Sequence, residues 1–155
     1  VLQIFADAYT PVVDSSAIPT GEIASVEGTP MDFRTEKQIG QDIRADFEQL
    51  HFTGGYDHKL VLGRPGEKKI MANAYCRESG IALEAETDCC GVQFYAGNFI
   101  GEQTGKGGAA YHDRSAFCLE SQFYPNAVNE PDFPSPVVKA GDTYHTETSY
   151  RFYLR

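Results

Sequence analysis

The sequence predicts an all-β fold with at most one short helix. Fifteen Gly and eight Pro are spread over 155 residues, and aromatic residues make up 12% of the chain. Short stretches rich in β-branched and aromatic residues alternate with turn residues, which is typical of antiparallel sheets. The length suffices for one domain with a hydrophobic core. We therefore expect residues 1–155 to belong to a single domain, without an internal repeat or a linker.

In the first third of the chain we expect two strands and the one helix. Residues 1–9 alternate apolar and mixed side chains, and residues 22–26 form a short apolar run, so both are predicted as strands. Residues 35–50 are predicted as a helix that Thr35 caps, although Gly40 should shorten or break it. The apolar residues spaced four apart on its expected face are Ile39, Ile43 and Phe47.

From residue 54 onward, short strands should alternate with tight turns. The predicted strands cover residues 57–62, 69–76, 81–87, 92–98, 117–124 and 145–154. The glycine-rich segment 101–108 lacks the GxxxxGK[ST] pattern of a phosphate-binding loop. We interpret it as a flexible connection.

Glu120 stands in the middle of the predicted strand 117–124. Since successive side chains of a strand point to opposite faces, Glu120 should share a face with Cys118 and Gln122. It is either a solvated residue on an outer face or a carboxylate on the polar floor of a cleft beneath the proline-rich loop 125–136. Cys118 as a nucleophile is a weaker hypothesis, because a small core residue explains it as well.

The charge and the cysteines narrow the function classes. The formal net charge of −9 makes nucleic acids and anionic membranes improbable partners and favours a neutral or cationic ligand. The four cysteines contain no CxxC pair, so we expect reduced thiols and a cytoplasmic location. Four scattered histidines lack metal-ligand spacing, and we expect no metal site: His51, His58, His112 and His145.

Two further polar residues stand in or next to apolar strands. Asp57 follows Gly54-Gly55-Tyr56, and Gln93 lies between Val92 and Phe94. Asp57 could instead be a turn aspartate that bonds its own backbone, and Gln93 a strand amide that faces water. Together with Glu120 and the neighbouring aromatic rings, they have the composition of a sugar site, because carboxylates and amides bind hydroxyl groups and aromatic faces cover the sugar ring.

Several segments along the chain resemble the C-terminal half of the galactose mutarotase (aldose 1-epimerase) family. They are Ile18-Pro19-Thr20-Gly21, Gly28-Thr29-Pro30-Met31-Asp32-Phe33-Arg34, Tyr56-Asp57-His58, Gly91-Val92-Gln93-Phe94-Tyr95-Ala96-Gly97-Asn98, Phe117-Cys118-Leu119-Glu120-Ser121-Gln122, Pro125-Asn126-Ala127-Val128-Asn129 and Gly141-Asp142-Thr143-Tyr144. Each segment is short, but their common order over most of the chain makes the resemblance specific.

The resemblance implies a large antiparallel β-sandwich, the galactose mutarotase-like supersandwich, of which this chain is the C-terminal part. It implies an aldose 1-epimerase in which Glu120 is the general base and in which Asp57 and Gln93 bind the sugar hydroxyls. A hexose is the substrate, and no cofactor or metal is required. A non-catalytic sugar-binding module of the same fold and a hexose-phosphate mutarotase are the alternatives.

The chain departs from the family pattern in four places. The family's upstream histidine pair, which includes the proton donor to the ring oxygen, has no match here, nor has its upstream asparagine-arginine pair. Cys90 stands where proline is usual, and Ser121 where threonine is common. Val1 already lies in a predicted strand, so we expect a missing N-terminal half as the partner of this chain and little activity without it.

Overall fold

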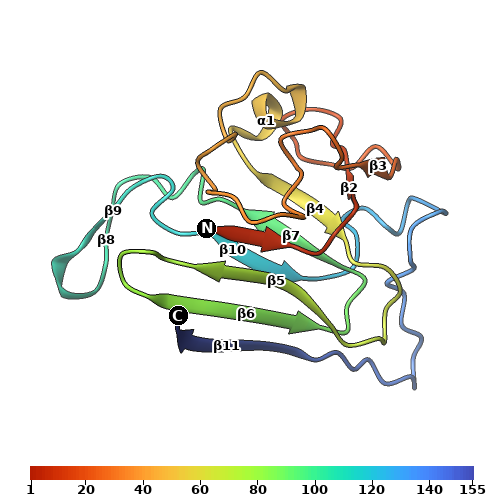
Figure 1. Cartoon of the computed structure of the whole chain (residues 1–155). Helices are drawn as coiled ribbons and strands as arrows, with labels where there is room; N and C mark the ends of the chain where they lie inside the picture. The colour runs from red at the N-terminus through yellow and green to blue at the C-terminus, as the bar shows by residue number, and fades with distance from the viewer.

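The computed structural model describes all 155 residues as two antiparallel sheets with one short helix (Figure 1). The predicted all-β class is confirmed. One sheet has the strand order β1-β5-β6-β11, the other the order β10-β7-β4-β2-β3, and β8-β9 forms a separate small hairpin. The elements are β1 Leu2–Ile4, β2 Ala8–Thr10, β3 Ala24–Ser25, α1 Glu48–Thr53, β4 Asp57–Val61, β5 Lys69–Tyr75, β6 Ile81–Thr87, β7 Gly91–Tyr95, β8 Gln103–Thr104, β9 Ala110–Tyr111, β10 Cys118–Ser121 and β11 Thr148–Leu154.

The hydrophobic core lies between the two sheets. It joins apolar side chains of β1, β5 and β6 to those of β4, β7 and β10. Three buried rings form its aromatic centre: Tyr56 and Phe94 stack with centroids 5.2 Å apart, and Phe33 meets both edge-on at 5.0 and 5.3 Å. Such edge-to-face pairs add to the stability that comes from burying the rings.

In the second sheet, β7 lies between β4 and the edge strand β10. The register places Gln93 of β7 opposite Lys59 of β4 on one side and opposite Glu120 of β10 on the other. These three residues therefore form one row across the sheet. Strand alternation turns Leu60, Phe94 and their neighbours toward the core, and the Lys59–Gln93–Glu120 row toward the opposite face.

The predicted helix over residues 35–50 is wrong. Residues 35–47 form turns, and α1 covers only Glu48–Thr53. Leu2 pairs with Lys37 in an isolated bridge, and the Lys37 ammonium donates to the Pro30 carbonyl at 2.7 Å. In the bridge, the N–H and the carbonyl of Lys37 both bond to Leu2, so they are not available for helical hydrogen bonds. The apolar residues at 39, 43 and 47 still pack on the core, so burial rather than helix formation explains their spacing.

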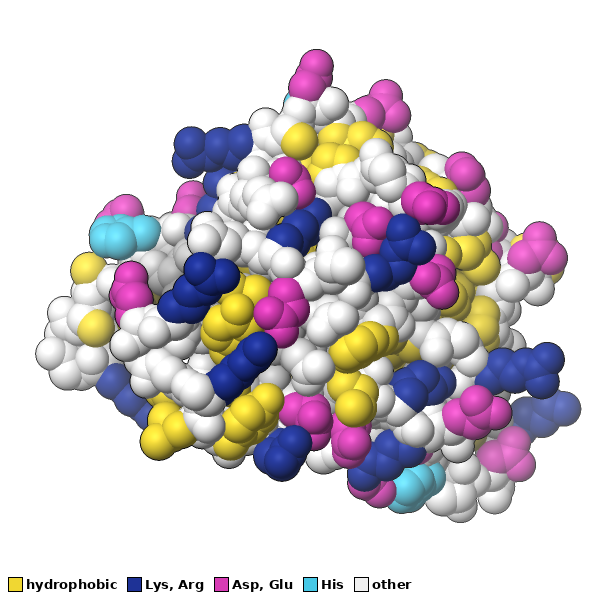
Figure 2. All heavy atoms as spheres, viewed as in Figure 1, with side chains coloured by type: hydrophobic (Ala, Val, Ile, Leu, Met, Phe, Trp, Pro, Cys, Tyr) yellow, Lys and Arg dark blue, Asp and Glu magenta, His cyan; other side chains and the backbone are white.

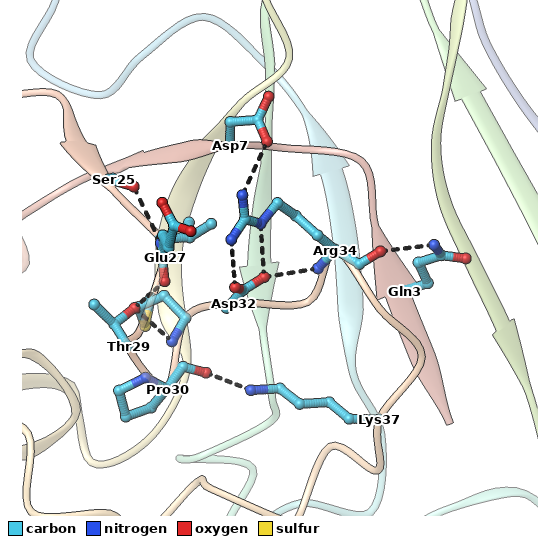
Figure 3. A network of polar contacts seen from close by, with 11 residues as sticks. Gln3, Asp7, Ser25, Glu27, Thr29, Pro30, Asp32, Arg34 and Lys37 are labelled. Carbon is cyan, nitrogen blue, oxygen red and sulfur yellow. Dashed lines mark hydrogen bonds and ion pairs between the residues drawn. The ribbon is translucent and has the colours of Figure 1, made fainter.

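A polar network holds the preceding segment against the first strand (Figure 3). The Arg34 guanidinium donates two hydrogen bonds to the Asp32 carboxylate, at 3.0 and 2.7 Å, and lies 3.5 Å from Asp7. The Gln3 amide donates to the Arg34 carbonyl at 2.8 Å. The bond from Arg34 lowers the pKa of Asp32. Because these contacts fix the chain up to Arg34, they direct residues 35–47 across the end of the core.

Several predicted strands are shorter or divided in the structure. Residues 1–9 form two strands, β1 and β2, because the chain passes from one sheet to the other between them. Three predicted strands are longer than the observed ones: only β3 is paired within residues 22–26, only β10 within 117–124 and only β11 within 145–154. The predicted strand 81–87 matches β6 over its full length. The glycine-rich segment carries β8 and a short 3₁₀ turn, Lys106–Gly108.

The surface mixes both signs of charge, and hydrophobic side chains gather near the C-terminal end of β11 (Figure 2). Phe152 and Leu154 are 69% and 81% exposed there. A surface cavity beside them is lined mainly by apolar residues, among them Leu83 and Phe117. None of the helices has the length and apolar character needed to cross a membrane.

Candidate active site

One face of the second sheet collects polar side chains from three strands. Strand alternation points every second residue of β4, β7 and β10 away from the core. The cross-strand partners on this face are Asp57 with Tyr95, Tyr95 with Cys118, Lys59 with Gln93, and Gln93 with Glu120. The structure therefore brings the three predicted site residues together on one face, from three strands that lie far apart in the sequence.

Two side-chain hydrogen bonds connect Gln93 to Asp57 and to Gln122 on this face. The Gln93 Nε2 donates to Asp57 Oδ1 at 2.8 Å, and the Gln122 Nε2 donates to Gln93 Oε1 at 3.3 Å. These bonds orient the Gln93 amide and leave the second carboxylate oxygen of Asp57 available. Glu120 lies next to Gln93 across the sheet and is exposed. Such a face can bind several hydroxyl groups and can present one free carboxylate to them.

The loop before β4 positions Asp57. Gly54 and Gly55 both have positive φ, 66° and 139°. A Cβ on Gly55 would lie 2.4 Å from Asn98 Oδ1, so only glycine fits there. The buried Asn98 amide donates to the Thr53 and Tyr56 carbonyls, both at 3.1 Å. Asn98 thus joins the segment after β7 to the segment that leads into Asp57. Apart from the adjacent Gly97, the sequence contains no pattern that indicates this role.

The proline-rich loop covers only one end of this face. Tyr124, Ala127 and Phe133 pack with Cys90 into a second hydrophobic cluster, and Val61 contacts its edge. Glu120 itself remains exposed, so the loop does not roof it. Cys118 is exposed on this face, so its interpretation as a small core residue is wrong. Partial burial of its thiol and the neighbouring Glu120 carboxylate raise the pKa of Cys118, which argues against a nucleophile as well.

Lys59 is the residue of this face that the sequence analysis missed. Its side chain is buried, and its ammonium donates to the main-chain carbonyl of Gln122. Burial lowers the pKa of Lys59 to about 7. The sequence could have indicated this residue, because Lys59 stands two positions after Asp57 in a predicted strand and that spacing places both side chains on the same face.

The histidines do not converge. His58 points into the core, whereas His51, His112 and His145 are exposed. No group of three or more His, Cys, Asp or Glu side chains has the arrangement of a metal site. Three surface cavities are lined by residues other than Asp57, Gln93 and Glu120.

Known proteins are similar to this chain in sequence and in fold. The family model for aldose 1-epimerase matches residues 1–151. Over 97% of this chain, the galactose mutarotase of Sus scrofa is 44% identical and the aldose 1-epimerase of Escherichia coli 38% identical. The crystal structure of an aldose epimerase homologue from C. elegans superimposes on 99% of the chain with a TM-score of 0.82 and 31% identity.

The chain spans 43%, 44% and 45% of the lengths of these three proteins. The superposition confirms the predicted mutarotase-type sandwich, of which the two sheets described above form a part. With a family model that covers nearly its whole length, the chain belongs to the aldose 1-epimerase family.

Proposed function

We propose that the protein containing this chain interconverts the α and β anomers of galactose- or glucose-type hexoses. The observation that carries the proposal is the row in which Glu120 lies beside Gln93, whose amide is bonded to Asp57. This row offers a free carboxylate next to groups that bind hydroxyls. The relatives that carry the names galactose mutarotase and aldose 1-epimerase support the same reaction.

In the proposed reaction, the Glu120 carboxylate accepts the proton of the anomeric hydroxyl. The C1–O bond of the ring then breaks as the C1 carbonyl forms, and the ring oxygen receives a proton from an acid. Rotation about the C1–C2 bond and reclosure in the reverse order give the other anomer. Asp57 and Gln93 hold the sugar hydroxyls during these steps. Proton transfer by one positioned side chain contributes roughly 10²- to 10⁴-fold to such a rate.

We infer that the acid comes from a segment outside this chain. None of the four histidines lies on the face of the sheet that carries Asp57, Gln93 and Glu120, because His58 of β4 points into the core and the other three lie outside β4, β7 and β10. The apolar residues exposed at the end of β11 and the cavity beside them suit contact with further protein. We propose that the rest of the domain, covalently joined or as a second chain, covers this surface and completes the site. We also propose a cytoplasmic location, which the four free cysteines support.

Glu120→Gln tests the proposed function in the longest form of the protein that its gene encodes. The substitution keeps the shape and removes the basic carboxylate, so kcat should fall by about 10²- to 10⁴-fold while sugar affinity changes little. Polarimetry on fresh α-galactose measures the rate, and calorimetry measures binding. Glu102→Gln, an exposed residue paired with His112, is the matched control.

Two results would contradict the proposal. Sugar binding without mutarotation in the wild type would indicate a non-catalytic sugar-binding module. A change in KM alone in Glu120→Gln would make Glu120 a binding residue rather than the base.

A further inference from the structure

Lys59 is a buried lysine in the same cross-strand row as the proposed base. It is 1% exposed, it pairs with Gln93 in the register of β4 and β7, and Gln93 pairs in turn with Glu120. The ammonium donates to the Gln122 carbonyl and lies 5.7 Å from the centre of the Tyr124 ring. The hydrogen-bond partner is thus a main-chain oxygen just beyond the end of β10, and not a carboxylate. Burying an ammonium in this way is costly, so its place in the fold calls for a reason.

The sheet makes room for this side chain at Gly91. A Cβ on Gly91 would lie 2.4 Å from Lys59 Cε and 2.9 Å from its Nζ. Gly91 is opposite Val61 in β4, so the glycine leaves a gap in the face into which the lysine folds. The Tyr124 ring, which lies near the ammonium, packs with Ala127 and Phe133 of the loop that follows it. Lys59 is therefore built into the sheet and is not a surface lysine.

The ammonium stands at the start of a chain of hydrogen bonds that runs through the site. It holds the Gln122 main chain, the Gln122 amide donates to Gln93, and the Gln93 amide donates to Asp57. Glu120 lies two residues before Gln122 in β10, a four-residue strand at the edge of its sheet. In its sheet β10 pairs with β7 alone. Just beyond its end, the Gln122 N–H donates to the Gly91 carbonyl at 3.1 Å and the Gln122 carbonyl accepts from Lys59, so the ammonium is one of two contacts that hold the Gln122 main chain.

We propose that Lys59 is a positioning residue of the active site, whose ammonium fixes the end of β10 and so holds Glu120 and the Gln122 amide beside the bound sugar. This inference rests on the proposed function, because it assumes that Glu120 is the base.

The proposal predicts a pH dependence. Burial lowers the pKa of Lys59 to about 7, and the nearby Glu120 carboxylate opposes this shift. Burial also raises the pKa of the adjacent Cys90 thiol, and that of the Tyr124 phenol to about 12. Both groups stay neutral while Lys59 loses its proton. A neutral amine forms a weaker bond to the Gln122 carbonyl than an ammonium, since charge-assisted hydrogen bonds are about twice as strong as neutral ones.

The test compares kcat and KM across about pH 5.5 to 9 in the wild type, in Lys59→Met and in Lys68→Met, using the longest form that the gene encodes. Lys68 is an exposed lysine paired with Glu86 and Glu147, and its substitution serves as the control. Because misplacing a catalytic group by about 1 Å can cost 10²-fold, the wild-type kcat should fall by about 10- to 100-fold as the pH rises through 7. In Lys59→Met, kcat should be low at every pH and should not fall as the pH rises through 7. The change in KM relative to the wild type should be smaller than the change in kcat.

A measurement on the folded wild type keeps the proposal open to refutation if Lys59→Met does not fold. NMR of the lysine Cε and Nζ nuclei should reveal one lysine that titrates with the kinetic profile, and Glu120→Gln should lower the pKa of that lysine. A Lys59 that titrates apart from the fall in kcat would overturn the inference, as would Lys59→Met with the wild-type kcat and profile. An inactive wild type would overturn the proposed function itself, whereas an active wild type with either of these results overturns only the role of Lys59.

Discussion

The buried His58 should make the fold acid-sensitive. It is 1% exposed, it points into the core from β4, and its ring meets that of Tyr9 edge-on with centroids 6.1 Å apart. The Asp57 backbone N–H donates to its Nδ1 at 3.3 Å, so Nε2 carries the proton of the neutral ring. A second proton on Nδ1 would face that N–H group. Burial lowers the pKa of His58 to about 4.

The sign and size of the effect follow from the two pKa values. The unfolded chain binds a proton at His58 below about pH 6.5, but the folded chain does so only below about pH 4. Stability is therefore fully present above about pH 6.5 and is lost as the pH falls toward 4. The difference of about 2.5 pH units corresponds to about 3.4 kcal/mol in total, of which about 1.8 kcal/mol is lost between about pH 7 and pH 5.

Urea unfolding at these two pH values measures the effect, with His58→Phe as the test and His51→Gln as the control. His51 is an exposed histidine beside Asp46. His58→Phe should be less stable at about pH 7, because the Asp57 N–H loses its acceptor, but it should lose about 1.8 kcal/mol less than the wild type on acidification. His51→Gln should follow the wild type. If His58→Phe and the wild type lose equal stability, the reasoning from the buried neutral ring is refuted.

Two further predictions concern the segment before Asp57 and the thiols. Asn98→Ala removes the donors to the Thr53 and Tyr56 carbonyls, so it should lower the free energy of unfolding by about 2–4 kcal/mol, as measured by urea unfolding. A loss below about 0.5 kcal/mol would contradict the structural role given to this amide. Thiol titration without reductant should find all four cysteines free in denaturant. In the folded protein only Cys76 and Cys118 should react, because the other two thiols are buried. Cys76 should react faster, because its hydrogen bond with Ser79 lowers its pKa whereas burial raises the pKa of Cys118. A pair of thiols that stays protected after denaturation would indicate a disulfide.

Much of the fold follows from local sequence patterns. Residues 81–87, a β-prone stretch next to turn residues, were predicted as a strand and form β6 to the residue, and Cys118 and Glu120 were correctly assigned to one face of their strand. These predictions succeed because side-chain direction in a strand depends on the backbone alone. Composition likewise sufficed for the all-β class, and the order of short motifs for the family.

Residues 35–50 show where local patterns fail. Apolar residues four apart fit a helix, but they fit equally well a chain of turns pressed onto the core. The bridge from Leu2 to Lys37 decides between them, and it joins segments about 35 residues apart in the sequence. Intrinsic helix propensity is worth only a few tenths of a kcal/mol per residue, so such tertiary contacts override it.

The sequence by itself therefore determined the fold class, the family and the identity of Asp57, Gln93 and Glu120 as candidate site residues. Only the tertiary structure decided that these three lie on one face of the sheet, that Gln93 is bonded to Asp57, and that Lys59 lies buried in the row of Gln93 and Glu120. The physical reason is the register between strands, which depends on long-range pairing and on the space left at Gly91. A buried and an exposed lysine have the same local pattern in a strand, and only the packing of Tyr124 and its loop distinguishes them.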